Sequence, residues 1–303
     1  IKNPQAKRTK HILSLSKEAT YRRILTGSPV TQSPMDLWSQ MDFLDPEILD
    51  QTSFYAFRTR YAVMISSTAA GGTHKYQKIV KFKNLKELGE KVAPHSYRIL
   101  KKDCLDLPDK VFQKRIVELT EEQTKAYEMM RRNAIAILNG EAMSAPNVLT
   151  QLIRLHQIVC GHMKTDEGNM IELKSNRINE LMNILDETSG KVIIWANYIN
   201  DIKAIEKEIQ KEYGFDSCCT YFGETKTEDR QICINKFQDP NSSIRFFIGN
   251  TQTGGYGITL TEASTVIYYS NNYDLEKRMQ SEDRAHRIGQ KNKVNYIDLV
   301  APK

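Results

Sequence analysis

The sequence predicts an α/β fold whose later part is a doubly wound parallel sheet. Over residues 191–303, short runs rich in β-branched and aromatic residues alternate with segments of helical apolar spacing. Such alternation is typical of a parallel sheet covered by helices on both faces. The chain has 303 residues, more than most single domains, so we expect two lobes that each bury a core.

The predicted elements of this later part follow one another closely. The strand-like runs are residues 191–198, 217–222, 243–250, 265–270 and 294–301, and the helical segments are residues 200–213, 227–237 and 274–288. In open parallel sheets, ligands bind outside the carboxyl ends of the strands. We therefore expect the chemistry of this protein in the loops that follow these strands.

The earlier part of the chain has a different pattern. Residues 36–175 consist mostly of long helical patterns with few strand-like runs, and this indicates helical insertions between two α/β pieces. Before them, a helical segment leads into a strand-like run, residues 22–26, and a Gly-Ser-Pro turn at residues 27–29 then breaks the chain. This turn is therefore another loop at the end of a predicted strand.

The charge balance favours polyanions as partners. Lys and Arg number 43 against 37 Asp and Glu, and the pI is near 8.9. The excess is uneven, because Glu18 is the single acid among the many basic residues of positions 1–23.

The cysteine pattern and the hydropathy indicate where the protein works. Five cysteines show no C-x-x-C pair and no metal-ligand spacing, so the sequence predicts neither a disulfide framework nor a structural metal. This usage fits the reducing interior of a cell. No apolar run approaches the roughly 18 residues that a membrane span needs, and no signal peptide opens the chain. We expect an intracellular protein with no membrane partner, and the opening IKNP, without Met, indicates an internal piece of a longer chain.

Three loops at predicted strand ends are candidate sites. They are the turn at residues 26–29, the glycine-rich loop at residues 250–260, and the segment that carries Arg284 and Arg287. A glycine-rich turn that enters a helix exposes N–H groups and suits phosphate, although tight packing of glycines is the alternative. Arginines three residues apart share a predicted helix face, and a solvated face paired to acids is the alternative there.

Five segments taken together resemble a known family. In order, they are LTGSP, KVIIWANY, YFGETKTEDRQICINKF, NTQTGGYGITLTEAS and QSEDRAHRIGQ, and they are similar to motifs III, IV, IVa, V and VI of the Swi/Snf-type helicase-like ATPases of superfamily 2. Residues 107–127 are similar to the family's crossing between its two RecA-like lobes. Motif V departs from the common pattern, since Gln252 replaces an arginine and Thr259 an asparagine. That departure is closest to the branch of annealing helicases and their bacterial and phage relatives.

The resemblance implies a domain organisation. Residues 1–107 would be the end of the first RecA-like lobe with a helical protrusion, residues 108–175 the interlobe linker with a helical insertion, and residues 176–303 the second RecA-like lobe. It also implies ATP and magnesium as cofactors, bound mainly by first-lobe motifs. The phosphate loop G-x-x-x-x-G-K-[ST] and the acidic box do not occur in this sequence. We therefore expect the missing N-terminal RecA-like half as a partner, and no ATPase activity from these residues alone.

The resemblance also assigns roles to single residues. Arg287 would be the arginine finger that follows charge on the γ-phosphate, with Arg284 as a phosphate clamp or as the partner of an acid. His286 would be a packing or interlobe contact, and Gln290 a polar contact across the cleft or plain surface. The further implied sites are Gly255, Gly257 and Gln280 for ATP, then Gly223, Thr225, Thr251, Gly254 and Asn197 for the DNA backbone, and Thr26, Gly27 and Ser28 for coupling hydrolysis to DNA. An N-cap of the following helix is the alternative for Thr225.

The function implied is that of an ATP-dependent translocase on double-stranded or branched DNA, of which this chain is the carboxy-terminal part. Two alternatives stay open from the sequence: a non-catalytic domain that binds nucleic acid or acts as a scaffold, and an RNA helicase. We expect a cytoplasmic protein if the source is bacterial or a phage, and a nuclear one if it is eukaryotic.

Overall fold

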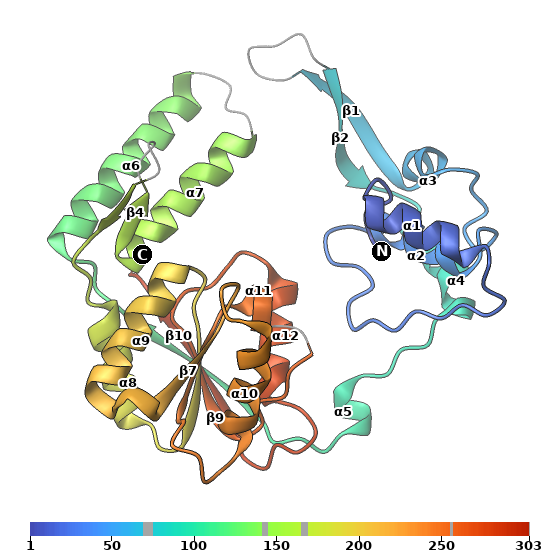
Figure 1. Ribbon diagram of the computed structural model, residues 1–303. Coiled ribbons are helices and arrows are strands. Elements are labelled where there is room, and N and C mark those ends of the chain that lie inside the picture. Colours follow the sequence, from blue (N-terminus) through green and yellow to red (C-terminus); the bar gives the residue numbers. More distant parts are fainter. Residues whose placement is uncertain (69–74, 141–144, 165–168, 255–256, 303) are drawn as a thin grey trace. The chain divides into compact units, whose positions relative to one another are not determined.

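The computed structural model describes residues 1–68, 75–140, 145–164, 169–254 and 257–302. Within this part, the side chains of residues 68, 75, 133–140 and 145–148 are not described. The chain divides into two compact units, Ile1–Leu100 (unit 1) and Lys101–Lys303 (unit 2), and each is described by itself (Figure 1).

Unit 1 is a small helical cluster with a β-hairpin. Its elements are α1 (Lys7–Ser16), α2 (Leu37–Leu44), α3 (Phe54–Tyr61), β1 (Ala62–Thr68), β2 (Lys75–Phe82) and α4 (Leu85–Val92). Aromatic rings fill its core: the ring centroids of Trp38 and Phe57 lie 5.5 Å apart, and those of Phe57 and Tyr61 lie 4.8 Å apart. β1 and β2 pair antiparallel.

Two expectations for unit 1 are wrong. Residues 22–26 form no strand, and the side chain of Leu25 is 98% exposed. A strand needs a neighbouring strand to satisfy its backbone hydrogen bonds, and the two strands described in this unit, β1 and β2, pair with each other. The hairpin β1–β2 occupies residues expected to be helical insertion. In β1, the β-branched residues Val63 and Ile65 lie two positions apart, a short signal of strand that the long helical patterns around it obscured.

Unit 2 contains the predicted doubly wound sheet. Its strands are β3 (Lys110–Ile116), β6 (Lys191–Trp195), β7 (Cys218–Tyr221), β8 (Phe246–Gly249), β9 (Ala263–Tyr268) and β10 (Val294–Val300), in the order β3-β10-β9-β6-β8-β7. All neighbouring pairs are parallel. The sixth strand, β3, was not predicted. It is an edge strand with mostly exposed side chains, so it lacks the buried apolar run that signals the others.

Helices cover both faces of this sheet. They are α8 (Arg177–Glu187), α9 (Ile199–Tyr213), α10 (Thr227–Gln238), α11 (Thr251–Gly254) and α12 (Leu275–Ala285). Along β6, Val192 and Ile194 pack with α8 and α9, whereas Ile193 and Trp195 pack with α10 and α12. This two-residue alternation builds two cores from one buried strand. The predicted fold class is confirmed.

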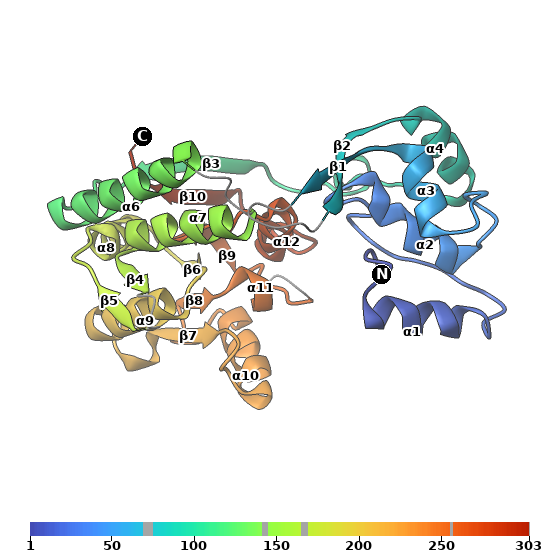
Figure 2. The same cartoon turned by 90° about the horizontal axis from the view of Figure 1, so that it is seen from above.

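A helical pair and a short hairpin interrupt unit 2 between β3 and α8. The pair is α6 (Glu121–Gly140) and α7 (Ala145–Cys160), which lie side by side in both views (Figures 1 and 2), and the hairpin is β4 (His162–Lys164) with β5 (Met170–Glu172). The expected helical insertion is therefore present. A four-residue helix, α5 (Lys101–Cys104), opens the unit.

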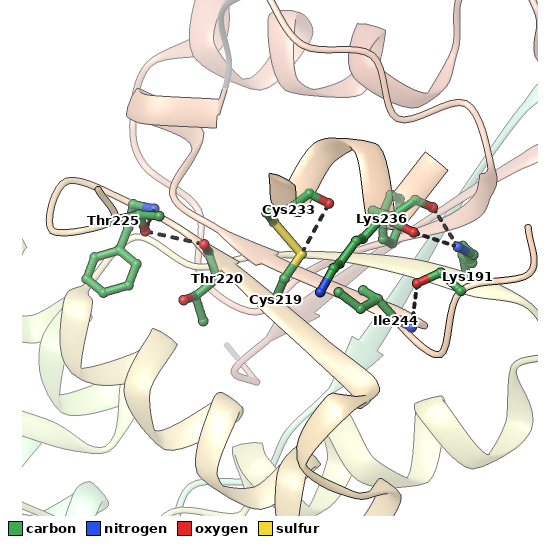
Figure 3. Close-up of a disulfide and its surroundings, with 10 residues drawn as sticks. Lys191, Cys219, Thr220, Thr225, Cys233, Lys236 and Ile244 are labelled. Atoms are coloured by element: carbon green, nitrogen blue, oxygen red, sulfur yellow. Dashed lines mark hydrogen bonds between the residues drawn. A yellow bond between two sulfur atoms is a disulfide. The ribbon is translucent and has the colours of Figure 1, made fainter. Parts of the chain in front are cut away.

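One cysteine pair corrects the sequence expectation. Cys219 on β7 and Cys233 on α10 form a disulfide with their Cα atoms 5.8 Å apart (Figure 3). The packing of α10 on β7 brings these residues together across 14 positions, a distance at which no short cysteine motif exists to be read. The end of helix α10 is capped from the neighbouring strand. Lys191, the first residue of β6, donates to the carbonyl oxygen of Phe237 at 2.7 Å.

Candidate nucleotide and nucleic-acid site

The two arginines converge, but not as two residues of one helix face. Helix α12 ends at Ala285, and His286 already has non-helical backbone angles, so Arg287 lies beyond the helix. The Gln290 side chain donates to the Ala285 carbonyl at 3.2 Å and helps to end the helix there. Even so, Arg284 and Arg287 each donate to the same carbonyl oxygen, that of Ile258, at 3.2 Å.

The acids next to the arginines are engaged elsewhere. Glu282 binds Lys110 at 3.0 Å, and Asp283 binds Lys101 at 2.6 Å. In the part of the chain that the structure describes, no carboxylate forms an ion pair with Arg284 or Arg287. Burial, and then the positive charge of Arg287, lowers the pKa of Arg284. Two half-buried cations that share one neutral acceptor are well suited to an incoming anion.

The glycines of the loop after β8 have separate structural reasons. A Cβ atom on Gly254 would lie 2.7 Å from the ring of Trp195, so close packing requires glycine there. Gly257 has a positive φ of +74° with open space around it, a conformation that favours glycine. Gly255 lies outside the described residues. Packing therefore explains Gly254, and backbone conformation explains Gly257.

The carboxyl ends of three central strands meet in one polar cluster. Asn250, after β8, donates to the main-chain carbonyl of Asn197, after β6, at 2.8 Å. The N–H of Asn197 donates to the hydroxyl of Ser270, after β9, at 2.8 Å. Thr251 is 6% exposed, and its hydroxyl accepts from the amide of Asn272 at 3.2 Å. The sequence reasoning missed Asn250, Ser270 and Asn272, although each follows a buried strand closely.

The loop between β7 and α10 is held from within. The Thr225 hydroxyl accepts from the Phe222 N–H at 3.1 Å and donates to the Thr220 carbonyl at 3.3 Å. Helix α10 begins at Thr227 with Lys226 as its N-cap residue, so the alternative role of Thr225 as the N-cap is wrong. Arg230, which sequence reasoning also missed, donates to the Thr225 carbonyl at 3.0 Å. Gly223 stays exposed at the tip of this loop.

Two family descriptions match these residues. The SNF2-related domain matches residues 1–164, and the helicase conserved C-terminal domain matches residues 174–289. The chain belongs to the Swi/Snf-type helicase-like ATPases of superfamily 2. The sheet of unit 2 is thus a RecA-like sheet, as predicted. The units divide at residue 100 and the two family matches between residues 164 and 174, so the predicted domain boundaries stay predictions.

Relatives of this Swi/Snf-type chain come from several kinds of organism. The SWI/SNF chromatin-remodeling complex subunit snf22 of Schizosaccharomyces pombe is 27% identical over 100% of this chain and 19% of its own length. An uncharacterized ATP-dependent helicase of Mycoplasma genitalium is 27% identical over 91% of this chain and 25% of its own. The solved SWI2/SNF2 ATPase core of Sulfolobus solfataricus in complex with double-stranded DNA is 29% identical, with a TM-score of 0.52, over 99% of this chain and 61% of that one. The chain therefore spans a fifth to a quarter of these curated relatives.

The motif VI helix of this Swi/Snf-type chain is held on two sides. Arg278 forms a fork with the carboxylate of Asp298 on β10, binds Glu282 at 2.9 Å, and lies 3.5 Å from the centroid of the Tyr268 ring. On the other side, His286 Nε2 lies 2.7 Å from the Pro108 carbonyl oxygen. His286 is thus a packing contact with the segment that precedes β3.

The two glutamines of motif VI differ in role. Gln290 is buried and donates to the carbonyl oxygens of Thr261 and Ala263 at 3.0 and 2.9 Å, so it is a structural residue and neither surface nor cleft contact. Gln280 donates to Glu276 at 3.0 Å, and within the described residues its side-chain oxygen is buried without a hydrogen-bond partner. The role of Gln280 toward ATP stays a prediction.

The motif III turn lies in unit 1. Thr26 Oγ1 accepts from the Ser28 N–H at 3.1 Å, and Gly27 has open space around the position of a Cβ atom. This is a local, exposed turn, and its assigned coupling role stays a prediction.

The arginines of this site suit a phosphate group. Guanidinium donors that no carboxylate neutralises within the described residues are well matched to phosphoryl oxygens. Among the described residues, no group of three or more His, Cys, Asp or Glu side chains could hold a metal ion.

None of the described helices is long and apolar enough to cross a membrane.

Proposed function

We propose that this chain is the carboxy-terminal part of an ATP-dependent translocase on double-stranded DNA. The observation that carries the proposal is the convergence of Arg284 and Arg287 on one carbonyl, free of acids, within a Swi/Snf-type RecA-like sheet. A guanidinium can exchange a neutral carbonyl for the charged oxygens of a γ-phosphate in a loose transition state. In this proposal, Arg287 is the finger and Arg284 the clamp.

ATP would lie against unit 2 where Arg284 and Arg287 converge on Ile258. When bound, ATP supplies the γ-phosphoryl group and its magnesium ion the neutralising charge. This chain contributes the two arginines, the free acceptor of Gln280 and the open turn at Gly257, with Gly255 as a further candidate. The phosphate loop and the magnesium ligands would come from the first-lobe half, which this sequence does not contain. Residues 1–303 alone should therefore hydrolyse no ATP.

The nucleic-acid track would follow the polar carboxyl edge of the sheet. Because the hydroxyls of Thr225 and Thr251 already bond within the protein, main-chain groups near them would make any backbone contact. Gly223 is exposed and Asn197 half-exposed, so they are the more accessible members of the proposed set. Gly254 would act indirectly, because its lack of a side chain lets the loop after β8 pack against the ring of Trp195. Such contacts are blind to base sequence.

The arginine assignment predicts a large kinetic effect in the complete enzyme. Arg287→Ala should reduce ATP turnover by about three to five orders of magnitude, as removal of an arginine finger does, with DNA affinity nearly unchanged. Arg287→Lys should restore little, because an ammonium group lacks the planar fork. Arg131→Ala, an exposed arginine on α6, is the matched control and should have no effect. Turnover that survives Arg287→Ala, with only a loss of stability, would contradict the assignment.

The choice of nucleic acid is tested by the same enzyme. ATPase assays with duplex, forked and single-stranded DNA and with RNA should show the strongest stimulation by duplex or branched DNA. A strong preference for single-stranded RNA would favour an RNA helicase. Binding without any hydrolysis by the complete protein would favour a scaffold.

By the same proposal the protein works inside the cell, in the nucleus if its source is eukaryotic and in the cytoplasm if it is bacterial or a phage. Imaging of the tagged protein tests this.

A further inference from the structure

The hairpin β1–β2 of unit 1 presents one face that its own unit leaves uncovered. Cα partners across an antiparallel pair share a face, and the register pairs Val63 with Lys81 and Ile65 with Lys78. Tyr76, two residues before Lys78, lies on this face as well. All five of these side chains are exposed, Tyr76 to 48% and Ile65 to 50%. Residues of the opposite face, such as Met64 and Ile79, are partly buried.

A β-bulge brings the two lysines onto this face. Lys78 and Lys81 are three residues apart, an odd spacing that would place them on opposite faces of a regular strand. The register shifts between Val63 and Met64, and Val80 is the extra residue of β2. The bulge therefore moves Lys81 to the side of Lys78, and such bulges commonly re-aim a side chain.

The hairpin carries positive charge that nothing in it balances. From residue 62 to residue 82 the sequence contains lysines but neither Asp nor Glu. Within the described residues, Lys78 and Lys81 form no ion pair, whereas Lys86 and Lys91 of the same unit bind Glu90 and Asp50. An exposed two-stranded ribbon with apolar and aromatic side chains is marginally stable by itself. A partner that covers this face would stabilise it.

We propose that this face of the hairpin binds the backbone of duplex DNA, with Lys78 and Lys81 on phosphates and Tyr76 against the sugar edge. The inference rests on the proposed function, in which the complete protein acts on DNA, and it adds a contact within unit 1. Three strand residues span roughly 10 Å, about three phosphate steps along the helix axis. A two-stranded ribbon also has the width that the major groove admits.

The charge pattern selects this occupant over others. Lysines are point charges suited to phosphate, and the face has no arginine, asparagine or glutamine to read bases, so binding would ignore sequence. A second copy of the same face would place lysine against lysine and repel it. A polyanion is therefore the partner that fits.

The test measures DNA binding by the complete protein with Lys78→Ala/Lys81→Ala. Two lost phosphate contacts should reduce the slope of log affinity against log salt by about 1.8 and weaken binding by tens-fold near 0.1 M salt. Lys86→Ala/Lys207→Ala removes the same charge from exposed sites on α4 and α9 and should change affinity only a few-fold. Lys78→Arg/Lys81→Arg should bind like the wild type. Tyr76→Ser should weaken binding without changing the slope.

A second measurement separates this inference from the proposed function. In the ATPase assay, the hairpin variant should need tens-fold more duplex for half-maximal stimulation, with unchanged hydrolysis in the absence of DNA. If the wild type is stimulated by duplex and the hairpin variant matches its control in affinity and slope, the hairpin inference is wrong and the proposed function stands. If the wild type neither binds duplex nor responds to it, both are overturned.

Discussion

At the scale of the residue, the glycines next to Trp195 show how a motif can serve packing. Trp195 is fully buried, and Cβ atoms on Gly249 and Gly254 would lie 2.9 and 2.7 Å from its ring. Gly254, which the resemblance assigned to the DNA backbone, thus makes room together with Gly249 for the largest side chain in the core of the sheet.

Gly254→Ala should therefore destabilise the protein by about 1–3 kcal/mol, the usual cost of an overpacked core. Gly223→Ala is the matched control, because a Cβ atom there meets nothing within 4 Å. Denaturant unfolding of the two variants checks this, and equal stabilities would show that the ring of Trp195 can move aside.

The half-buried His156 gives the stability a dependence on pH. Its Nδ1 lies 2.9 Å from the Tyr198 hydroxyl. Burial, and then the positive charge of Arg177, lowers the pKa of His156 from 6.5 to about 4. Between these two values the unfolded chain binds a proton that the folded chain does not, so stability falls as pH falls from about 6.5 to about 4.

The loss assigned to His156 should be about 2 kcal/mol between pH 7 and pH 5. His156→Gln stays neutral and can keep a hydrogen bond to Tyr198, so it should remove this part of the pH dependence. Urea unfolding of both proteins at the two pH values measures the difference. Parallel losses would mean that other groups cause the effect.

At the scale of the element, the disulfide ties helix α10 to the edge strand β7. It closes a loop of 14 positions, and closing a loop of this size stabilises a fold by about 3 kcal/mol. Cys219→Ser/Cys233→Ser should lower the melting temperature of unit 2, while Cys104→Ser, an exposed cysteine, should not.

Thiol counting tests whether the bond exists in the cell. Protein lysed into denaturant with an alkylating agent should carry the label on three cysteines, Cys104, Cys160 and Cys218, and reduction should then release two more thiols, those of Cys219 and Cys233. Disulfides are rare in reducing compartments, so five free thiols at lysis would show that the pair is reduced there.

At the scale of the whole molecule, the chain holds its cores in separate stretches of sequence. The core of unit 1 is built from residues between Met35 and Leu88, and the two cores of unit 2 from residues between Val117 and Leu299. Residues 101–303 should therefore fold alone, with a cooperative transition within a few degrees of that of unit 2 in the full chain. Calorimetry of the fragment and limited proteolysis near residue 100 check this. A fragment that fails to melt cooperatively would contradict it.

Sequence patterns predicted the strands and helices of unit 2 whose apolar side chains are buried, because the spacing of apolar residues reflects which side chains face the core. They missed β3, whose Phe112 and Ile116 are 57% and 63% exposed, since an edge strand leaves no such pattern. The two arginines were identified as a pair, but their geometry was not. The end of α12 depends on contacts from outside the helix, such as His286 to Pro108, which no local pattern encodes.

For the candidate site as well, the sequence predicted which residues are present but not what they contact. Gly, Thr and Asn residues at the ends of strands could be identified from the sequence. What each does could not, because the hydroxyls of Thr225 and Thr251 are taken by partners that only the fold brings near.

The contacts before β3 also decide how force would travel through the chain. Tension applied at residue 100 would meet the bonds of Lys101 to Asp283 and of Pro108 to His286 before it reached the strands of the sheet. The segment from Asp283 to Arg287 would receive this tension first, and it is the segment from which Arg284 and Arg287 reach toward Ile258. A pull on the start of unit 2 would therefore act on the arginines before it acted on the sheet.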